Sequence, residues 1–199
     1  MTVLRSWLQA PRVGHAAEVA APLVIDFEDV FKAHFEYVWH SLRRLGVHER
    51  DLEDVAHDVF VTVHPRLGAY DPSRPLRPWL FAFACRAAAD YRKHSRHRLT
   101  LTDDPDALRD PAVAPDEQAA SRQQLEFVAR ALEALDFDRR AIFILHEIDG
   151  VSTPEAARAL GIPTNTAYSR LRLAREDFAA ALRRSHFDRN GSEGKEGER

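Results

Sequence analysis

The chain of 199 residues is 45% hydrophobic and 30% charged, a composition typical of soluble globular proteins with one or two small domains. It has no run of about 18 apolar residues and no apolar core of a signal peptide near its start, which excludes a membrane-spanning helix and leads us to expect a cytoplasmic protein. The single cysteine, Cys85, excludes an internal disulfide, and a net charge of −3, if spread evenly, argues against a nucleic-acid partner.

Two amphipathic helices are predicted in the first part of the chain. Residues 1–24 contain two prolines and show no period, so we interpret them as an N-terminal extension. Apolar side chains then recur three and four positions apart over 27–45 and 52–63. Gly46 closes the first helix, and Pro65 ends or kinks the second.

The second of these helices has an acidic outer face. It lies in the segment 26–70, which contains nine acidic and five basic residues. Its apolar positions form one stripe: Leu52, Val55, Ala56, Val59, Phe60 and Val63. Polar side chains lie off that stripe and are expected to face outward: Glu53, Asp54, His57 and Asp58. Such a face is suited to binding another protein.

A third helix is predicted after the turn-rich segment 70–75, with Pro78 in its first turn. Its expected buried face consists of Trp79, Leu80, Phe83, Ala84, Ala87, Ala88 and Tyr91. The segment 74–98 contains seven bases and one acid. Basic side chains neutralise phosphates and aromatic rings stack on bases, a combination suited to single-stranded or melting DNA. The candidates for contact are Arg77, Phe81, Arg86, Arg92, Lys93, Arg96 and Arg98. The alternative is that the aromatic residues are core and the bases form a solvated helix end.

An acidic segment over 99–120 separates this region from a second one. It holds six acids, one base and no aromatic residue, which is typical of a flexible linker. Apolar spacing predicts further helices over 125–135 and 141–148. The fold class is therefore all-α, with two small helical domains joined by a flexible acidic linker. The expected order is an extension, the first domain, the linker, the second domain and a disordered tail: 1–24, 25–98, 99–120, 121–184 and 185–199.

The second domain contains the pattern of a helix-turn-helix. A short helix is expected to begin at Ser152 or Thr153, and Gly161 fits the left-handed position of a tight turn. A longer helix, capped near Thr164 or Asn165, then places its first turns against base edges in the DNA major groove. The side chains suited to that contact are Asn165, Thr166, Tyr168, Ser169, Arg170, Arg172 and Arg175. The alternative is a plain helical hairpin whose arginines form a solvated face.

Residues 26–98 and 121–184 together resemble the extracytoplasmic-function sigma factors of bacterial RNA polymerase. The segment ERDLEDVAHDVFVTV resembles the helix that docks on the clamp helices of the largest polymerase subunit. The resemblance implies a core-binding surface made of Asp51, Glu53, Asp54, His57, Asp58 and Phe60. PWLFAFACRAAADYRKHSRHR resembles the part that opens and reads the −10 promoter element, and GIPTNTAYSRLRLAR resembles the helix that reads the −35 element. The chain departs from the common family pattern at His57-Asp58, Arg86 and Tyr168.

The resemblance also implies the partners of the chain. Core RNA polymerase would supply the active site and its magnesium, while this chain would recognise the promoter and open its strands. The expected partners are therefore core polymerase, promoter DNA and an anti-sigma factor that holds the protein inactive. No enzyme activity and no cofactor of its own are expected.

Two other classes of protein are weighed against this interpretation. A metalloenzyme is considered because there are ten histidines, but His146-Glu147 is not followed by a second histidine in the metalloprotease pattern, and no cysteine pair or phosphate loop occurs. We therefore expect no metal site. An autonomous helix-turn-helix regulator is the second alternative, with the first domain as sensor or dimeriser. A dense acidic helix face beside an aromatic and basic segment favours a polymerase subunit instead.

Overall fold

Helices form every regular element in the part of the chain that the structure describes. The structure is a computed structural model that describes residues 26–101 and 128–193, with side chains described for 26–95 and 128–184. The predicted all-α fold class is confirmed. The predicted N-terminal extension and the linker beyond residue 101 lie outside the described residues.

Helix α1 spans Phe27–Arg44 and follows the predicted bounds closely. It begins where the Asp26 carboxylate accepts a hydrogen bond from the backbone N–H of Glu28 at 3.4 Å. It is followed by Gly46, whose φ of +94° lies in the left-handed region that glycine adopts without strain.

Helix α2 spans Leu52–Val63 and is preceded by a short 3-10 turn, Glu49–Asp51. It is followed directly by a second 3-10 helix, His64–Ala69, where Pro65 was predicted to end or kink α2. Pro65 explains this end, because its ring removes a backbone N–H that a longer α-helix would use.

Helix α3 spans Leu76–Leu101 and contacts both α1 and α2. It runs beyond the predicted domain end at 98. Five consecutive side chains of its first half are buried, Leu80, Phe81, Ala82, Phe83 and Ala84. An α-helix that packs on one side only buries every third or fourth residue, so α3 is covered on more than one side.

The second domain contains a helix over 128–133, α5 (Phe137–Phe143), a π-helical turn (Ile144–Ile148), α6 (Thr153–Leu160) and α7 (Thr164–Glu193). The predicted helix-turn-helix is confirmed. Ser152 caps α6, and Gly161 adopts the left-handed conformation with φ +67° before α7. Helix α7 begins at Thr164, so its cap lies just before the predicted positions.

The prediction of an irregular tail from residue 185 is wrong as far as Glu193, because α7 continues to that residue. Extending an existing helix avoids the cost of nucleating a new one, so polar residues after a packed helix can remain helical. Residues 194–199 of the predicted tail lie outside the described part of the chain.

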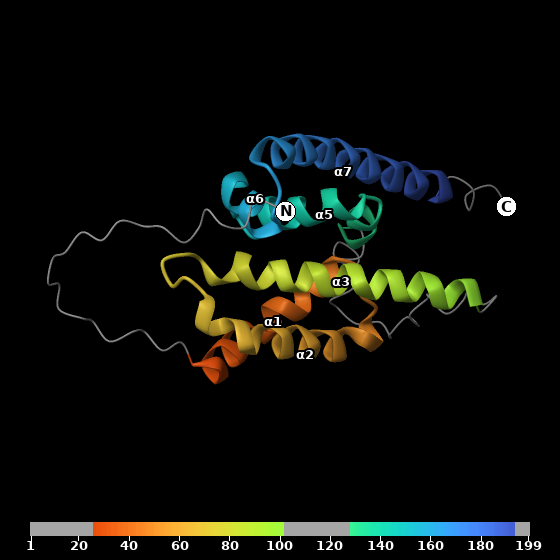
Figure 1. Ribbon diagram of the computed structural model, residues 1–199. Helices are drawn as coiled ribbons and strands as arrows, with labels where there is room; N and C mark the ends of the chain where they lie inside the picture. The colour runs from red at the N-terminus through yellow and green to blue at the C-terminus, as the bar shows by residue number, and fades with distance from the viewer. Residues whose placement is uncertain (1–25, 102–127, 194–199) are drawn as a thin grey trace, which may run out of the picture.

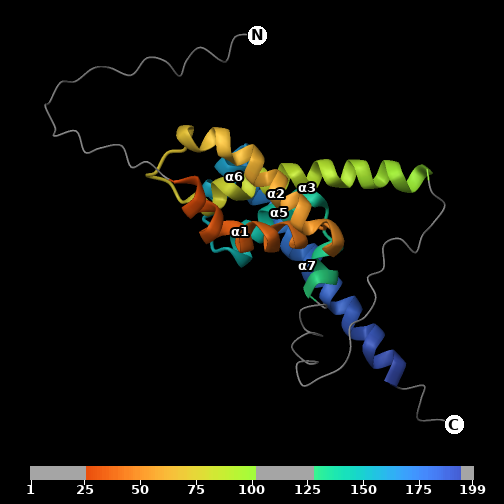
Figure 2. The same ribbon diagram turned by 90° about the horizontal axis from the view of Figure 1, so that it is seen from below.

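The two helical sets pack directly against each other. Figure 1 shows α1 and α2 on one side of α3, and α5, α6 and α7 on the other. Figure 2 shows the same neighbourhood from below, with the C-terminal ends of α3 and α7 leaving the packed body in different directions. Helix α3 contacts α6, and the buried side chains of both sets form one cluster. The sequence did not predict this contact, since the linker permits many arrangements.

Candidate functional site

The outer face of α2 carries the predicted acidic side chains. Glu53, Asp54, His57 and Asp58 are all exposed, as the apolar period predicted. The His57 Nδ1 atom lies 2.8 Å from the backbone oxygen of Glu53, one turn earlier in the same helix. The four side chains are therefore accessible to a binding partner.

Two members of the predicted core-binding surface lie elsewhere. Phe60 is 2% exposed, and its ring packs against Phe31 with centroids 4.9 Å apart, so its prediction as a contact residue is wrong. It belongs to the apolar stripe of α2, which faces α1. Asp51 is half-buried, and its Oδ2 atom accepts a hydrogen bond from the Tyr91 hydroxyl of α3 at 2.6 Å. This bond ties the start of α2 to α3.

Val61 belongs to the exposed face of α2 and was missed by the sequence interpretation. It is 71% exposed, the most exposed of the large hydrophobic residues found on the described surface. It lies three residues after Asp58, on the same side of the helix. A helical projection of residues 52–63 would have separated it from the buried stripe.

The predicted DNA contacts of α3 divide into exposed and buried residues. Phe81 is 0% exposed, so its prediction as a contact residue is wrong. Arg77, Arg86 and Lys93 are exposed. Arg92 is half-buried, and its guanidinium lies 4.8 Å from the centroid of the Phe137 ring in the second domain. The side chains of Arg96 and Arg98 lie outside the described residues.

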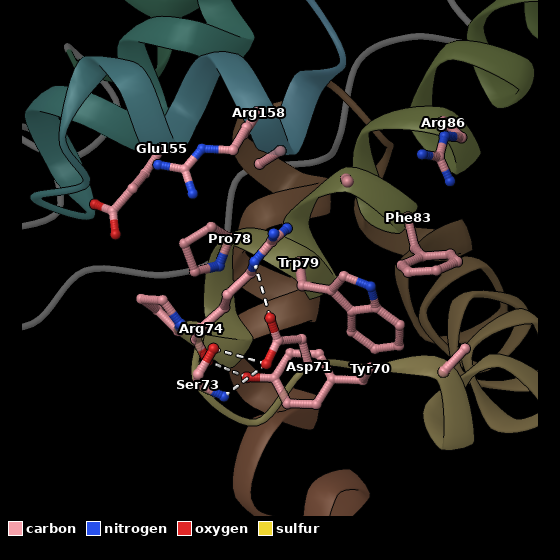
Figure 3. A pocket seen from close by; sticks show the side chains of 14 residues that line it. Tyr70, Asp71, Ser73, Arg74, Pro78, Trp79, Phe83, Arg86, Glu155 and Arg158 are labelled. Atoms are coloured by element: carbon pink, nitrogen blue, oxygen red, sulfur yellow. Dashed lines mark hydrogen bonds and ion pairs between the residues drawn. The ribbon is translucent and has the colours of Figure 1, made fainter. Parts of the chain in front are cut away.

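A cleft of about 560 Å³ lies beside the first turns of α3. Figure 3 shows its aromatic wall, where the Trp79 ring lies between Tyr70 and Phe83 with centroid distances of 5.1 and 4.8 Å. Cationic side chains surround that wall: Arg74, Arg86 and Arg158. Planar rings beside guanidinium groups are suited to an unpaired base and its phosphate. The sequence pointed to the basic part of this segment but not to Arg158, which comes from α6.

The first turns of α7 present a polar outer face. Asn165, Tyr168, Ser169 and Arg172 are exposed, whereas Thr166 is half-buried. The opposite side of the helix is buried through Ala167, Leu171 and Ala174. Arg172 forms an ion pair with Glu176 of the same helix at 2.6 Å and remains 64% exposed. This arrangement leaves the outer face free to enter a groove.

Two predicted contact arginines of α7 are ion-paired with other helices. The Arg170 Nη2 atom lies 2.6 Å from Asp138 Oδ2 at the start of α5. The Arg175 Nη2 atom lies 2.7 Å from Glu147 Oε1 in the π-helical turn. Arg170 is only 30% exposed, so it lies at the edge of the outer face rather than at its centre.

Asp149 connects the second domain to the first, and no motif pointed to it. The Tyr37 hydroxyl donates a hydrogen bond to Asp149 Oδ2 at 2.7 Å, and Arg44 Nη1 lies 3.8 Å from Oδ1. Burial raises the pKa of the Asp149 carboxyl above its ordinary value, while Tyr37 and Arg44 act in the opposite direction. Burial likewise raises the pKa of the Tyr37 hydroxyl.

Family models match both helical domains. The sigma-70 region 2 model matches residues 30–98, and the sigma-70 region 4 model matches residues 127–178. The RNA polymerase sigma factor CnrH of Cupriavidus metallidurans is 32% identical over 176 residues, which span 84% of this chain and 92% of CnrH. The ECF RNA polymerase sigma factor SigL of Mycobacterium tuberculosis is 30% identical over 165 residues, spanning 82% of this chain and 90% of SigL. The chain belongs to the extracytoplasmic-function sigma factors.

Solved structures show the same relationship for this sigma factor. CnrH, in complex with the cytosolic domain of CnrY, superposes with a TM-score of 0.58 at 30% identity, covering 78% of this sigma factor and 86% of that chain. RpoE of Bartonella quintana, in complex with the anti-sigma factor NepR, superposes with a TM-score of 0.60 and covers 79% and 97% of the two chains. At 22% identity, the second comparison shows a shared fold.

This sigma factor is therefore a transcription initiation factor that binds core RNA polymerase and recognises promoters. The family and function expected from the sequence are confirmed. None of the helices in the described ranges has the length and apolarity needed to cross a bilayer. Across the same ranges, no three histidine, cysteine or acidic side chains come together as metal ligands.

Proposed function

We propose that the exposed face of α2 is the surface that binds core polymerase. It combines three carboxylates with one exposed apolar side chain: Glu53, Asp54, Asp58 and Val61. Carboxylates steer a basic partner into place, and an apolar side chain adds contact area that is lost from water on binding. Phe60 supports this surface from inside the domain by fixing α2 against α1.

The cleft at the start of α3 is proposed to bind the −10 element as a single strand. Tyr70 and Trp79 are half-buried and offer stacking faces, whereas Phe83 is buried. Arg74, Arg86 and Lys93 supply positive charge along the same helix and the preceding loop. Base stacking contributes on the order of 1–3 kcal/mol per base and tolerates any sequence. This combination is suited to holding a strand once the duplex has opened.

The outer face of α7 is proposed to read the −35 element in the major groove. Asn165, Ser169 and Arg172 lie at the centre of that face, with Tyr168 and Arg175 at its edge. Arginine and asparagine side chains pair with guanine and adenine edges, and a tyrosine ring can contact a thymine methyl group. The two DNA contacts are tethered to one large enzyme, so each can be modest.

Four further assignments follow from family membership. The chain carries out no chemistry itself, because core polymerase supplies the catalytic site. It acts in the cytoplasm, directs polymerase to a specific regulon, and is held inactive by an anti-sigma factor. The complexes of CnrH with CnrY and of RpoE with NepR support the last assignment.

The separation of an acidic face on α2 from basic faces on α3 and α7 is the observation that carries this proposal. It is tested by reversing one charge, Asp54→Lys, and measuring binding to purified core polymerase. We expect a loss of affinity of about tenfold or more, since the variant places a cation against a basic partner surface.

Glu36→Lys is the matched control, because it makes the same change in charge on α1 at a side chain that is 89% exposed. It should bind core polymerase like the unmodified protein. Equal binding by Asp54→Lys and Glu36→Lys would remove α2 from the proposed interface.

A further inference from the structure

The cleft beside α3 is lined by a loop and two helices. The loop 69–75 and the first turns of α3 contribute most of the lining, and Glu155, Arg158 and Ala159 of α6 complete it. Its volume of about 560 Å³ lies within the range of about 300–1,000 Å³ that is typical of sites for small molecules. The cleft is therefore large enough to hold one small ligand.

The Trp79 ring offers a stacking face in this cleft. It is half-buried and lies between the rings of Tyr70 and Phe83, which are inclined to it by 52° and 68°. The Tyr70 hydroxyl donates a hydrogen bond to the carbonyl oxygen of Arg74, which fixes the Tyr70 ring within the loop. An indole ring supported on two sides keeps one orientation, so a planar ligand can stack on it at little entropic cost.

Two guanidinium groups of the cleft have no carboxylate partner among the described residues. Arg86 of α3 and Arg158 of α6 are both exposed, and neither forms an ion pair within the described part of the chain. The Arg86 guanidinium lies 5.2 Å from the centroid of the Phe83 ring. Arg74, in contrast, is paired with Asp71 at 3.2 Å. Arginine binds phosphate through paired N–H donors, so two unpaired guanidinium groups on separate helices suit a ligand with several phosphates.

Glu155 adds a hydrogen-bond acceptor on the α6 side of the cleft. Its Oε2 atom accepts a hydrogen bond from the Ser152 hydroxyl at 2.7 Å, and its Oε1 atom has no partner among the described residues. A carboxylate accepts several hydrogen bonds, including those from an amino group or a ribose hydroxyl. A free ribonucleotide carries such donors, whereas a DNA strand running past this carboxylate presents phosphates, which it repels. This side of the cleft therefore favours a free ribonucleotide.

We propose that the cleft binds a free ribonucleoside 5′-triphosphate, with its base stacked on Trp79 and its phosphates held by Arg86 and Arg158. Stacking tolerates any base, so the site selects for the phosphates rather than for one base. The proposal goes beyond the binding of the −10 strand and does not rest on it. The two ligands share one chemistry, a planar base with phosphate, and would compete for Trp79.

The site is tested by isothermal titration calorimetry of the full chain at low salt, with ATP, AMP and inorganic triphosphate as separate ligands. ATP should bind about tenfold more tightly than either of the others, because it alone offers both a stacking base and several phosphates. Equal binding of ATP and inorganic triphosphate would indicate charge attraction without a base site. That result, or equal binding of ATP and AMP, would overturn the proposal.

Arg158→Ala tests the contribution of α6 to the site. It should lower the affinity for ATP about tenfold, since it removes a charge-assisted contact to phosphate. Arg183→Ala is the matched control, because it removes the same charge from an exposed position on α7 that does not line the cleft. Equal ATP affinities of these two variants would overturn the proposal.

Trp79→Leu tests the stacking of the base. It should lower the affinity for ATP about tenfold and leave the affinity for inorganic triphosphate unchanged, with an unaltered far-UV circular dichroism spectrum. An oligothymidine distinguishes a DNA strand from a free nucleotide. Oligothymidine binding that needs Arg158, in a chain that does not bind ATP, would assign the cleft to a strand alone and overturn the proposal. Lys93→Ala, outside the cleft, should weaken oligothymidine binding and leave ATP binding unchanged, which separates the two proposals.

Discussion

Arg170 and Arg172 lie two positions apart on α7 and have different surroundings. Two successive steps along an α-helix turn a side chain by about 200°. Arg172 is 64% exposed on the outer face, whereas Arg170 is 30% exposed and pairs with Asp138 of α5. A reciprocal pair joins the same two helices, with Arg139 Nη1 2.6 Å from Asp177 Oδ2. We therefore expect Arg172 rather than Arg170 to contact bases, since the ion pair of Arg170 with Asp138 joins α7 to α5.

Alanine substitutions at these two arginines should have different effects. Arg172→Ala should weaken binding to −35 promoter duplex by about 1–3 kcal/mol, the range for one lost base contact, without changing stability. Arg170→Ala should lower the free energy of unfolding by up to about 1 kcal/mol, since a partly exposed ion pair contributes little. Gel-shift titration and urea denaturation measure the two quantities. A larger loss of duplex binding in Arg170→Ala than in Arg172→Ala would contradict the assignment.

At the scale of elements, the turn between α6 and α7 sets the direction of α7, the helix that is proposed to read the −35 element. Gly161 adopts φ +67°, and no heavy atom lies within 4 Å of the position that its Cβ would take. Substitution at this glycine therefore meets no steric contact, and its cost comes from the backbone conformation alone.

Gly161→Ala should lower the free energy of unfolding by about 1 kcal/mol, the cost of the left-handed conformation for a residue with a Cβ. Gly161→Asn should cost less, because asparagine tolerates this conformation better. Urea denaturation of the three proteins measures the difference. An alanine variant as stable as the parent would show that the turn is not held in this conformation.

The helices themselves could be predicted from the sequence, because apolar spacing and turn residues act locally. The apolar stripe of α2 predicted that Phe60 faces inward, whereas the family resemblance assigned Phe60 to the core-binding surface. The packing of Phe60 against Phe31 shows that the prediction from the stripe is correct. Phe81 was assigned outward because α3 was expected to have one buried side. The second domain covers another side of α3, and a contact between distant segments leaves no period in the sequence.

At the scale of the whole molecule, the acidic and the basic surfaces lie on different helices. The exposed face of α2 is acidic, the exposed side chains of α3 are mainly basic, and the outer face of α7 combines uncharged polar side chains with Arg172 and Arg175. Across the domain contact, the Arg92 guanidinium of α3 lies 4.8 Å from the centroid of the Phe137 ring of α5.

Run-off transcription on genomic fragments, with purified core polymerase that lacks any other sigma factor, tests the central claim most directly. Adding this chain should produce transcripts of defined length from a small set of fragments, and Asp54→Lys should reduce them. The start sites would also identify the −10 and −35 elements that the chain reads. Absence of transcripts with the unmodified chain, under conditions where the same core enzyme responds to another sigma factor, would contradict the account.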